Sequence, residues 1–339
     1  MRGSRPSRTS APSSSAERRG EMAYKDTDFM YASARVSVFE TKLLTKEKYM
    51  QLIDAATEAD AVALFADAVT PVYTDGAFDI EATIEGLLGT AFSEVAKSIP
   101  DPKLFDFMRY EYDANNLKAA IKAKVGGIEA DGMLFACGTA SPEAAVAAVE
   151  SGEYKAFPAH MAAAAPKALT AYAATRDPQS IDLAIDRAAF ADMLDAAAAD
   201  ETLTAAIKLR IDAINVQTAV RLLDAGKPAG LSAMLLDGGN LPVRTFKVAD
   251  RAALAEALDE KNAKVAVLLA DPDASLAAIG RAAETLLGTG TGAQFVPFGL
   301  AKIYAYLSAV QREAKNLRII FALRAAHADR ETILQNIRV

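Results

Sequence analysis

Pairs of acidic side chains lie close together at several points of this 339-residue chain, and such pairs could support general acid–base chemistry. Glu111 and Asp113 form one pair, and Asp192 and Asp195 form another. Neither pair is set among apolar neighbours that would clearly raise a carboxyl pKa, so we expect no strongly raised pKa among the acids. The acids are therefore interpreted as solvated or structural, and no catalytic residue is predicted.

Other residues that commonly carry chemistry are few. Cys137 is the only cysteine, and its apolar and small neighbours favour a buried structural thiol over a nucleophile. A single cysteine forms no internal disulfide and fits a reducing compartment. His160 and His327 are the only histidines, too few for a zinc site or His-based catalysis, and we interpret both as incidental polar residues. We predict no metal and no cofactor.

One glycine-rich run leaves an enzyme interpretation open. Residues 288–292 read "GTGTG" and follow "VAVLL" (265–269), which could be a buried strand before a phosphate-binding turn. A dinucleotide fingerprint requires its glycines between a strand and the next helix. Here the glycines follow a helical run and precede "AQFVPFG", so we interpret them as a linker between domains.

The overall composition favours helices. Alanine dominates, tryptophan is absent and aromatic residues make up 7% of the chain. The net charge of −7 argues against nucleic acid as the main partner. No apolar run approaches the roughly 20 residues that a membrane-spanning helix needs, so we expect membrane association only through a partner.

Helix boundaries are marked by capping residues. Asp101 with Pro102 predicts a helix start and Gly126–Gly127 its end, while Ser141 with Pro142 and Gly152 predict a second helix. Asp177 and Asp271 precede proline in the same way and predict two further starts. Because strand alternation is scarce, the fold class predicted is all-α.

One motif occurs three times, at intervals of about 100 residues, which is too long for a solenoid unit. The copies are "DANNLKAAI" (113–121), "DAINVQTAV" (212–220) and "EAKNLRIIF" (313–321). On a helix, the acid, the Asn and the aliphatic residue of each copy share the face that otherwise meets the core. These motif residues are Asp113, Asn116, Leu117, Asp212, Asn215, Val216, Glu313, Asn316 and Leu317.

The polar motif residues on that face must find hydrogen bonds if they are buried. We expect backbone ends of neighbouring helices as partners, and the alternative is that acid and Asn lie at the wet edge of the face. The next residue of each copy, Lys118, Gln217 or Arg318, should point off the face toward solvent or a partner protein.

The repeat also predicts a domain organisation. Residues 1–21 are rich in Arg, Ser and Pro, lack apolar periodicity and are expected to be a disordered leader or tag. Three related helical domains are expected at 22–135 (with the N-terminal helices), 136–238 and 239–339. Three such domains could close around a pseudo-threefold axis and leave a central hollow.

Three segments connect these residues with a known family. They are "YASARVSVFETKLLTKEKYMQLIDA" (31–55), "FDFMRYEYDANNLKAAIKA" (105–123) and "FVPFGLAKIYAYLSAVQREAKNLRIIFALRA" (295–325). Together they resemble the C subunit of the V-type and A-type rotary ATPases, and the related d subunit of eukaryotic V-ATPases, over residues 22–339. The last segment is the most specific, with Gly299, Tyr306, Leu307, Ala309, Glu313, Asn316, Leu317, Arg318 and Ile320 at family positions.

The resemblance implies an all-helical, three-domain funnel with pseudo-threefold symmetry that acts as a socket. One side would rest on the proteolipid rotor ring at the cytoplasmic face of the membrane, and the cavity would grip the coiled-coil central shaft. Such a protein transmits torque for proton or sodium transport, has no chemistry or cofactor of its own, and is a monomer in isolation with one copy per rotor. The alternative from the residues alone is a helical-repeat adaptor unrelated to rotary ATPases.

Overall fold

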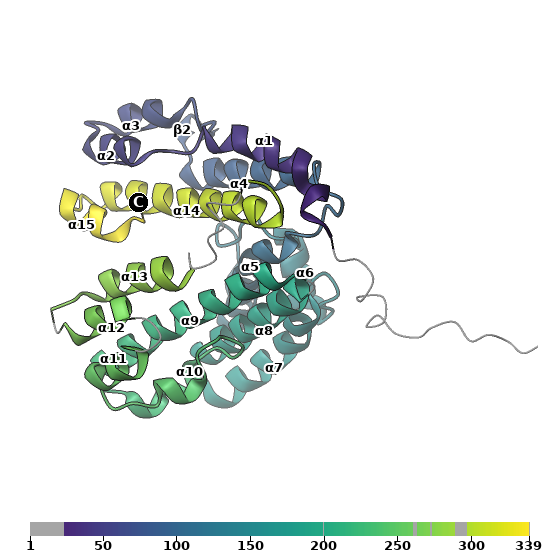
Figure 1. Cartoon of the computed structure of the whole chain (residues 1–339). Helices are drawn as coiled ribbons and strands as arrows, with labels where there is room; N and C mark the ends of the chain where they lie inside the picture. The colour runs from purple at the N-terminus through teal and green to yellow at the C-terminus, as the bar shows by residue number, and fades with distance from the viewer. Residues whose placement is uncertain (1–23, 199, 260–262, 272, 289–296, 339) are drawn as a thin grey trace, which may run out of the picture.

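Helices dominate the architecture. The computed structural model describes residues 24–338 except 199, 260–262, 272 and 289–296. Within these residues there are fifteen α-helices and one short hairpin, β1 (Tyr73–Thr74) and β2 (Ala77–Phe78), so the all-α prediction is confirmed (Figure 1). The helices are α1 (Met30–Glu40), α2 (Lys46–Asp54), α3 (Glu58–Phe65), α4 (Ile80–Ala96), α5 (Tyr110–Gly126), α6 (Pro142–Ser151), α7 (Ala159–Thr175), α8 (Gln179–Ala197), α9 (Glu201–Asp224), α10 (Leu231–Met234), α11 (Arg251–Asp259), α12 (Ala263–Ala270), α13 (Leu276–Gly288), α14 (Leu300–Ala325) and α15 (Arg330–Asn336).

Local capping chemistry explains where several helices begin and end. Helix α6 has the predicted bounds, because Ser141 caps its N-terminus through Ala144 N and Gly152 ends it at φ 77°. Helix α5 ends at Gly127 with φ 66°, again as predicted. Each of these glycines takes the left-handed conformation that other residues avoid.

Two of the predicted helix starts are wrong. Asp101 accepts a hydrogen bond from Lys103 N at 2.9 Å, which makes a local turn instead of a cap, and α5 begins only at Tyr110. Asp271 likewise bonds Asp273 N at 2.9 Å, and Ser275 is the residue that caps α13. In both places the aspartate begins a turn that precedes the helix. Asp177 bonds Gln179 N in the same way, at 3.0 Å, but α8 follows at once and begins at Gln179, so the position of that start is confirmed.

Buried apolar side chains form three clusters, which define three packing groups named here after their motif helices. The α5 group comprises α5–α8, and the α9 group comprises α9–α13. The α14 group combines α14 and α15 with α1–α4, from the opposite end of the chain. Figure 1 shows these purple and yellow helices lying together above the teal and green ones.

This grouping differs from the ranges expected from the repeat spacing, because α14 packs against both α1 and α4. The cluster of the α14 group also continues into α8 and α9, through residues such as Met193 and Ile207. The domain boundaries themselves stay a prediction.

Candidate functional site

The amide of the motif Asn makes the same pair of hydrogen bonds in every copy. Its nitrogen donates to the backbone oxygen, and its oxygen accepts from the backbone nitrogen, of one residue 19, 21 or 22 positions later. The side chains are at most 1% exposed, so the wet edge of the helix is not where they lie. The pairs are Asn116–Phe135 (2.8 and 2.9 Å), Asn215–Leu236 (2.9 and 2.8 Å) and Asn316–Arg338 (2.9 and 2.9 Å).

The motif acid is buried beside the Asn and ties its helix to the segment that leads into another helix. In each copy a carboxylate oxygen accepts a backbone N–H there. The donors are Ala140 N to Asp113 (2.9 Å), Leu241 N to Asp212 (2.9 Å) and Leu44 N to Glu313 (2.6 Å). Acid and amide together therefore hold the backbone at two points against each motif helix. In the first two copies both points lie in one loop (135 and 140, 236 and 241), and in the third they are Arg338 and Leu44.

Two of these acids lie directly against a glycine. A Cβ atom at Gly138 would collide with Oδ1 of Asp113, and one at Gly239 would collide with Oδ1 of Asp212. The close approach of carboxylate and backbone thus requires glycine at both positions.

The third copy is completed by the N-terminal part of the chain. Leu44 directly precedes Thr45, which caps α2, just as Ala140 precedes the cap of α6. A cation further along each motif helix shows the same correspondence. Lys124 Nζ donates to Val149 O in α6 at 2.6 Å, and Arg324 donates to Ile53 O in α2 at 2.7 Å. Helix α2 therefore occupies in the α14 group the place that α6 occupies in the α5 group.

The residues expected to face solvent or a partner are only partly exposed, and each lies against a helix of its own packing group. Lys118 and Arg318 make ion pairs, and Gln217 lies against a glycine of α13. A contact with another protein is not tested by this geometry and stays a prediction. The neighbours are Asp186 in α8 for Lys118 (2.6 Å), Gly280 in α13 for Gln217, and Glu81 in α4 for Arg318 (Nε to Oε1, 2.7 Å).

Contacts just before the motif acids join the three motif helices, at the start of α5 and near the middle of α9 and α14. Glu111 of α5 forms an ion pair with Arg210 of α9, and α9 packs against α14. Gln311 of α14 donates to Met108 O, two residues before α5, at 2.8 Å. Glu111, Arg210 and Gln311 all lie two residues before the motif acid, so equivalent positions of the three copies converge.

The positive charges near Glu111 favour the ionised form of its carboxyl group. Burial raises the pKa of its carboxyl group, but the positive charges of Arg210 and Lys315 outweigh that effect and lower the pKa to about 2. We call Glu111, Arg210 and Gln311 the junction residues. Sequence reasoning treated Glu111 only as a member of an acid pair and missed the other two, although their equal offset from the motif was visible.

The residues considered for catalysis have structural surroundings. Cys137 is buried, so the predicted burial of this thiol is confirmed, and burial raises its pKa to about 12. Asp192 accepts the backbone N–H groups of His160 and Met161 at the start of α7, at 2.8 and 2.9 Å. The ring of His160 lies at the surface, 3.0 Å from Asp195. His327 is exposed in a left-handed turn after α14.

The expectation that no acid has a strongly raised pKa is wrong for Glu313. Burial raises the pKa of its carboxyl group to about 7, and the hydrogen bond from Leu44 N only partly offsets the desolvation. Burial also raises the pKa of Asp113 and of Asp192. No local pattern announces this, because the elements that cover Glu313 come from the other end of the chain.

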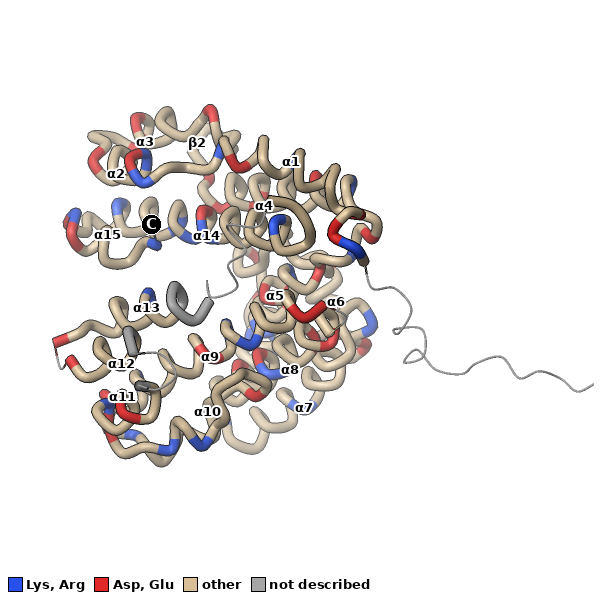
Figure 2. The backbone as a smooth tube through the Cα atoms, in the orientation of Figure 1, with Lys and Arg blue, Asp and Glu red and all other residues tan. Residues whose placement is uncertain are grey.

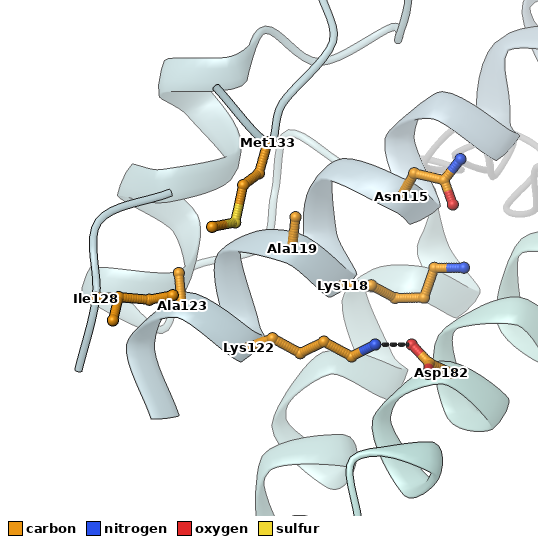
Figure 3. Close-up of a pocket in the computed structure, with 8 residues that line it drawn as sticks. All are labelled: Asn115, Lys118, Ala119, Lys122, Ala123, Ile128, Met133 and Asp182. Atoms are coloured by element: carbon orange, nitrogen blue, oxygen red, sulfur yellow. Dashed lines mark ion pairs between the residues drawn. The ribbon is translucent and has the colours of Figure 1, made fainter. Parts of the chain in front are cut away.

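A pocket of about 380 Å³ lies along α5 (Figure 3). Lys122 on its wall is paired with Asp182 at 2.5 Å, and Lys118 is paired with Asp186. The lining thus combines ion-paired lysines with apolar side chains, and it places no nucleophile beside a base. The lining residues are Asn115, Lys118, Ala119, Lys122, Ala123, Ile128, Met133 and Asp182.

Charged residues of both signs occur in all three packing groups. Figure 2 shows Lys and Arg positions interspersed with Asp and Glu positions along the backbone. In the part of the chain that the structure describes, no helix is long and apolar enough to cross a membrane, and His, Cys, Asp and Glu form no group suited to a metal ion. The "GTGTG" run lies outside the described residues except for Gly288, where α13 ends, and "VAVLL" is part of α12 and not a strand.

Comparison with known proteins decides the family. The chain matches the ATP synthase (C/AC39) subunit family over residues 32–336. It belongs to this family. The A-type ATP synthase C subunit of Thermococcus kodakarensis is 27% identical over 326 residues, which cover 89% of this chain and 88% of the relative.

Other relatives align over shorter stretches. The A-type ATP synthase C subunit of Thermococcus gammatolerans is 26% identical over 125 residues, 35% of this chain and 34% of the relative. Its counterpart of the same name in Pyrococcus horikoshii is 23% identical over 135 residues, 38% of this chain and 36% of the relative. Membership of the ATP synthase (C/AC39) subunit family decides against the alternative of an adaptor unrelated to rotary ATPases.

Proposed function

We propose that this chain is the non-catalytic coupling subunit of a V/A-type rotary ATPase. It connects the coiled-coil central shaft to the proteolipid rotor ring at the cytoplasmic face of the membrane. It is a peripheral component, monomeric in isolation and present once per rotor, and it transmits torque for proton or sodium transport. The family match and the names of its relatives support this role.

The structural observation that carries the proposal is the junction of the three motif helices. A torque-transmitting part must keep its lobes in fixed relative positions under load. The Glu111–Arg210 ion pair links α5 to α9, and α9 packs on α14. The bond from Gln311 to Met108 O links α14 to the turn directly before α5. The acid and amide of each motif helix in turn hold the backbone at two points, so displacement of one packing group is resisted at several points.

The surroundings of the acids support a non-catalytic role. Among the described residues, carboxyl groups with raised pKa include those of Asp106, Asp113, Asp186, Asp192 and Glu313. Asp113, Asp192 and Glu313 accept backbone N–H groups, and Asp186 is paired with Lys118. These contacts stabilise the fold. They explain why the carboxyl groups are buried, without any need for a substrate.

The experiment compares ATP hydrolysis with ion transport. The catalytic head is assayed alone, and the complete complex is assembled in vesicles with and without this chain. We expect the head to hydrolyse ATP without it, and ATP-driven ion uptake to require it. Failure of the head to hydrolyse ATP unless the chain is added would contradict the non-catalytic role, and uptake without the chain would contradict coupling.

A matched set of variants tests the junction. Glu111→Arg places two cations at the contact between α5 and α9, whereas Glu111→Arg combined with Arg210→Glu restores an ion pair in reverse. We expect the single variant to lower ion uptake per ATP hydrolysed and the double variant to recover most of it. Equal uptake for both would show that the junction does not transmit load.

A further inference from the structure

A second repeated pattern lies on the helices that pack against the motif helices. Helix α8 contains "AIDRAA" (184–189) and α13 contains "AIGRAA" (278–283). The two isoleucines, Ile185 and Ile279, are both fully buried. The residue after each faces the equivalent position of its motif helix, since Asp186 pairs with Lys118 and Gly280 lies against Gln217. The next residues, Arg187 and Arg281, are therefore structural equivalents.

Arg187 joins the α5 group to the α9 group. Its NH2 group donates to Ala233 O and Leu235 O, both at 2.9 Å, and its Nε donates to Leu235 O at 3.1 Å. These carbonyl groups belong to the end of α10 and the residue after it, directly before Leu236, whose backbone Asn215 holds. A guanidinium group at this place satisfies carbonyl groups that a helix end leaves free.

A related contact joins the α14 group to the α5 group. Glu85 lies one helical turn beyond Glu81, the residue of α4 that faces Arg318 as Asp186 of α8 faces Lys118. Its carboxylate accepts Ala136 N at 2.6 Å, one residue beyond Phe135, which Asn116 holds. Helices α4 and α8, which pack against the motif helices of their own groups, thus each contact the next group beside the residue that its motif Asn holds. Helix α4 contacts Ala136, and α8 contacts residues 233–235.

At the third seam, between α13 and α15, the corresponding contact is not made. Helix α13 packs beside α15 (Figure 1), but NH1 of Arg281 is buried and has no hydrogen-bond partner. Burial of an unpaired guanidinium nitrogen is unfavourable. The segment that Asn316 holds ends α15 in the same way as the segment that Asn215 holds ends α10. By the offsets of Leu235 and Ala233 from Leu236, the equivalent carbonyl groups are those of Ile337 and Gln335.

We propose that the seam between α13 and α15 closes as the seam between α8 and α10 does, with the guanidinium group of Arg281 donating to the backbone oxygens of Ile337 and Gln335. The described structure is the open form of this latch. With this contact, each packing group is hydrogen-bonded to the next in a closed cycle. The buried NH1 of Arg281 also gains a hydrogen-bond acceptor. The inference concerns contacts within the chain and does not depend on the proposed coupling role.

Hydrogen exchange of the full chain tests the latch. The Ile333, Ile337 and Arg338 amides in and after α15 donate hydrogen bonds that closure would protect. We expect Arg281→Ala to raise their exchange rates several-fold while residues 231–236 exchange as before. Arg187→Ala should instead raise the exchange rates of residues 231–236 and leave the three α15 amides unchanged. Arg221→Ala, at an exposed position of α9, should change the exchange of neither segment.

Unchanged exchange of these three amides in a folded Arg281→Ala variant would overturn the proposal. If that variant unfolds globally, Arg281→Lys decides, because lysine keeps the charge and the aliphatic stem but cannot hold two carbonyl oxygens through a planar fork. Faster exchange confined to residues 333–338 in Arg281→Lys supports the latch, and wild-type exchange in that variant refutes it.

Discussion

The carboxylate of Glu313 accepts the backbone N–H of Leu44 at 2.6 Å, across 269 positions of sequence. The corresponding acids Asp113 and Asp212 are each bonded to a segment that follows them within 30 residues. The last motif helix instead uses the segment before α2. The α14 group is therefore built from both ends of the described chain.

Replacing Glu313 with glutamine should remove a pH dependence of stability. Its pKa is raised from the ordinary 4.5 to about 7 by burial, so the stability it contributes is present below about pH 4.5 and is lost as the pH rises to about 7. We expect Glu313→Gln to be more stable than the unaltered chain above pH 7, by roughly 3 kcal/mol at most, and equal to it near pH 4.5. Denaturant unfolding across this pH range measures the difference.

The exposed Glu331→Gln is the matched control for that experiment and should leave the pH profile unchanged. If the free energies of unfolding of Glu313→Gln and the unaltered chain changed with pH in parallel, ionisation of Glu313 would not destabilise the fold, and the prediction would be wrong.

Replacing a motif Asn with leucine should strip one backbone segment of both hydrogen bonds. Asn116→Leu leaves the N–H and C=O of Phe135 unpaired, and we expect a loss of about 1–3 kcal/mol in the free energy of unfolding. Asn215→Leu and Asn316→Leu should behave alike. The control is Asn115→Leu, one residue away on the exposed side of α5. Equal melting of Asn115→Leu and Asn116→Leu would contradict a role for the buried amide.

Glycine substitutions should separate positions of close contact from open ones. Gly138→Ala and Gly239→Ala drive a methyl group into the carboxylate of Asp113 or Asp212, so we expect each to destabilise the chain by about 2 kcal/mol or more. Gly89→Ala, within α4 and with no atom near its Cβ position, should instead stabilise by up to about 1 kcal/mol. Thermal unfolding of the three variants gives the comparison, and a common sign for all three would refute it.

The ion pair between Glu111 and Arg210 should contribute measurable coupling. Both side chains are mostly buried, so a double-mutant cycle with Glu111→Gln and Arg210→Gln should give a coupling energy of about 1 kcal/mol or more. The pair Glu153–Lys155, whose side chains are 63% and 89% exposed, should give almost none. Because the pKa of Glu111 is lowered to about 2, its contribution should be present above about pH 4.5 and fade as the pH falls toward 2.

Features that depend on interactions between residues close in sequence could be predicted from the sequence. The all-α class followed from helix-forming composition and from caps such as Ser141, which act over three or four residues. The shared face of Asp113, Asn116 and Leu117 followed from helical periodicity alone, and the structure buries all three. The starts at Asp101 and Asp271 were wrong because Asp-Pro is equally suited to a turn.

Long-range contacts were out of reach of such reasoning. Nothing near Glu313 indicates that Leu44 is its partner or that burial raises its pKa. The junction of Glu111 with Arg210 likewise depends on how two helices approach in space. The equivalence of Arg187 and Arg281 was visible in "AIDRAA" and "AIGRAA", but its meaning required the bonds that Arg187 makes.

The shared core of the first and last helices also has a consequence for biosynthesis. Helices α1–α4 emerge from the ribosome while α14, against which they pack, is still more than 200 residues from being translated. At about 5–20 residues per second that interval lasts on the order of ten seconds or more. During it, apolar side chains such as Phe65 and Leu88, fully buried in the finished chain, have no lasting cover. Nascent chains of this protein should therefore bind chaperones through their N-terminal helices.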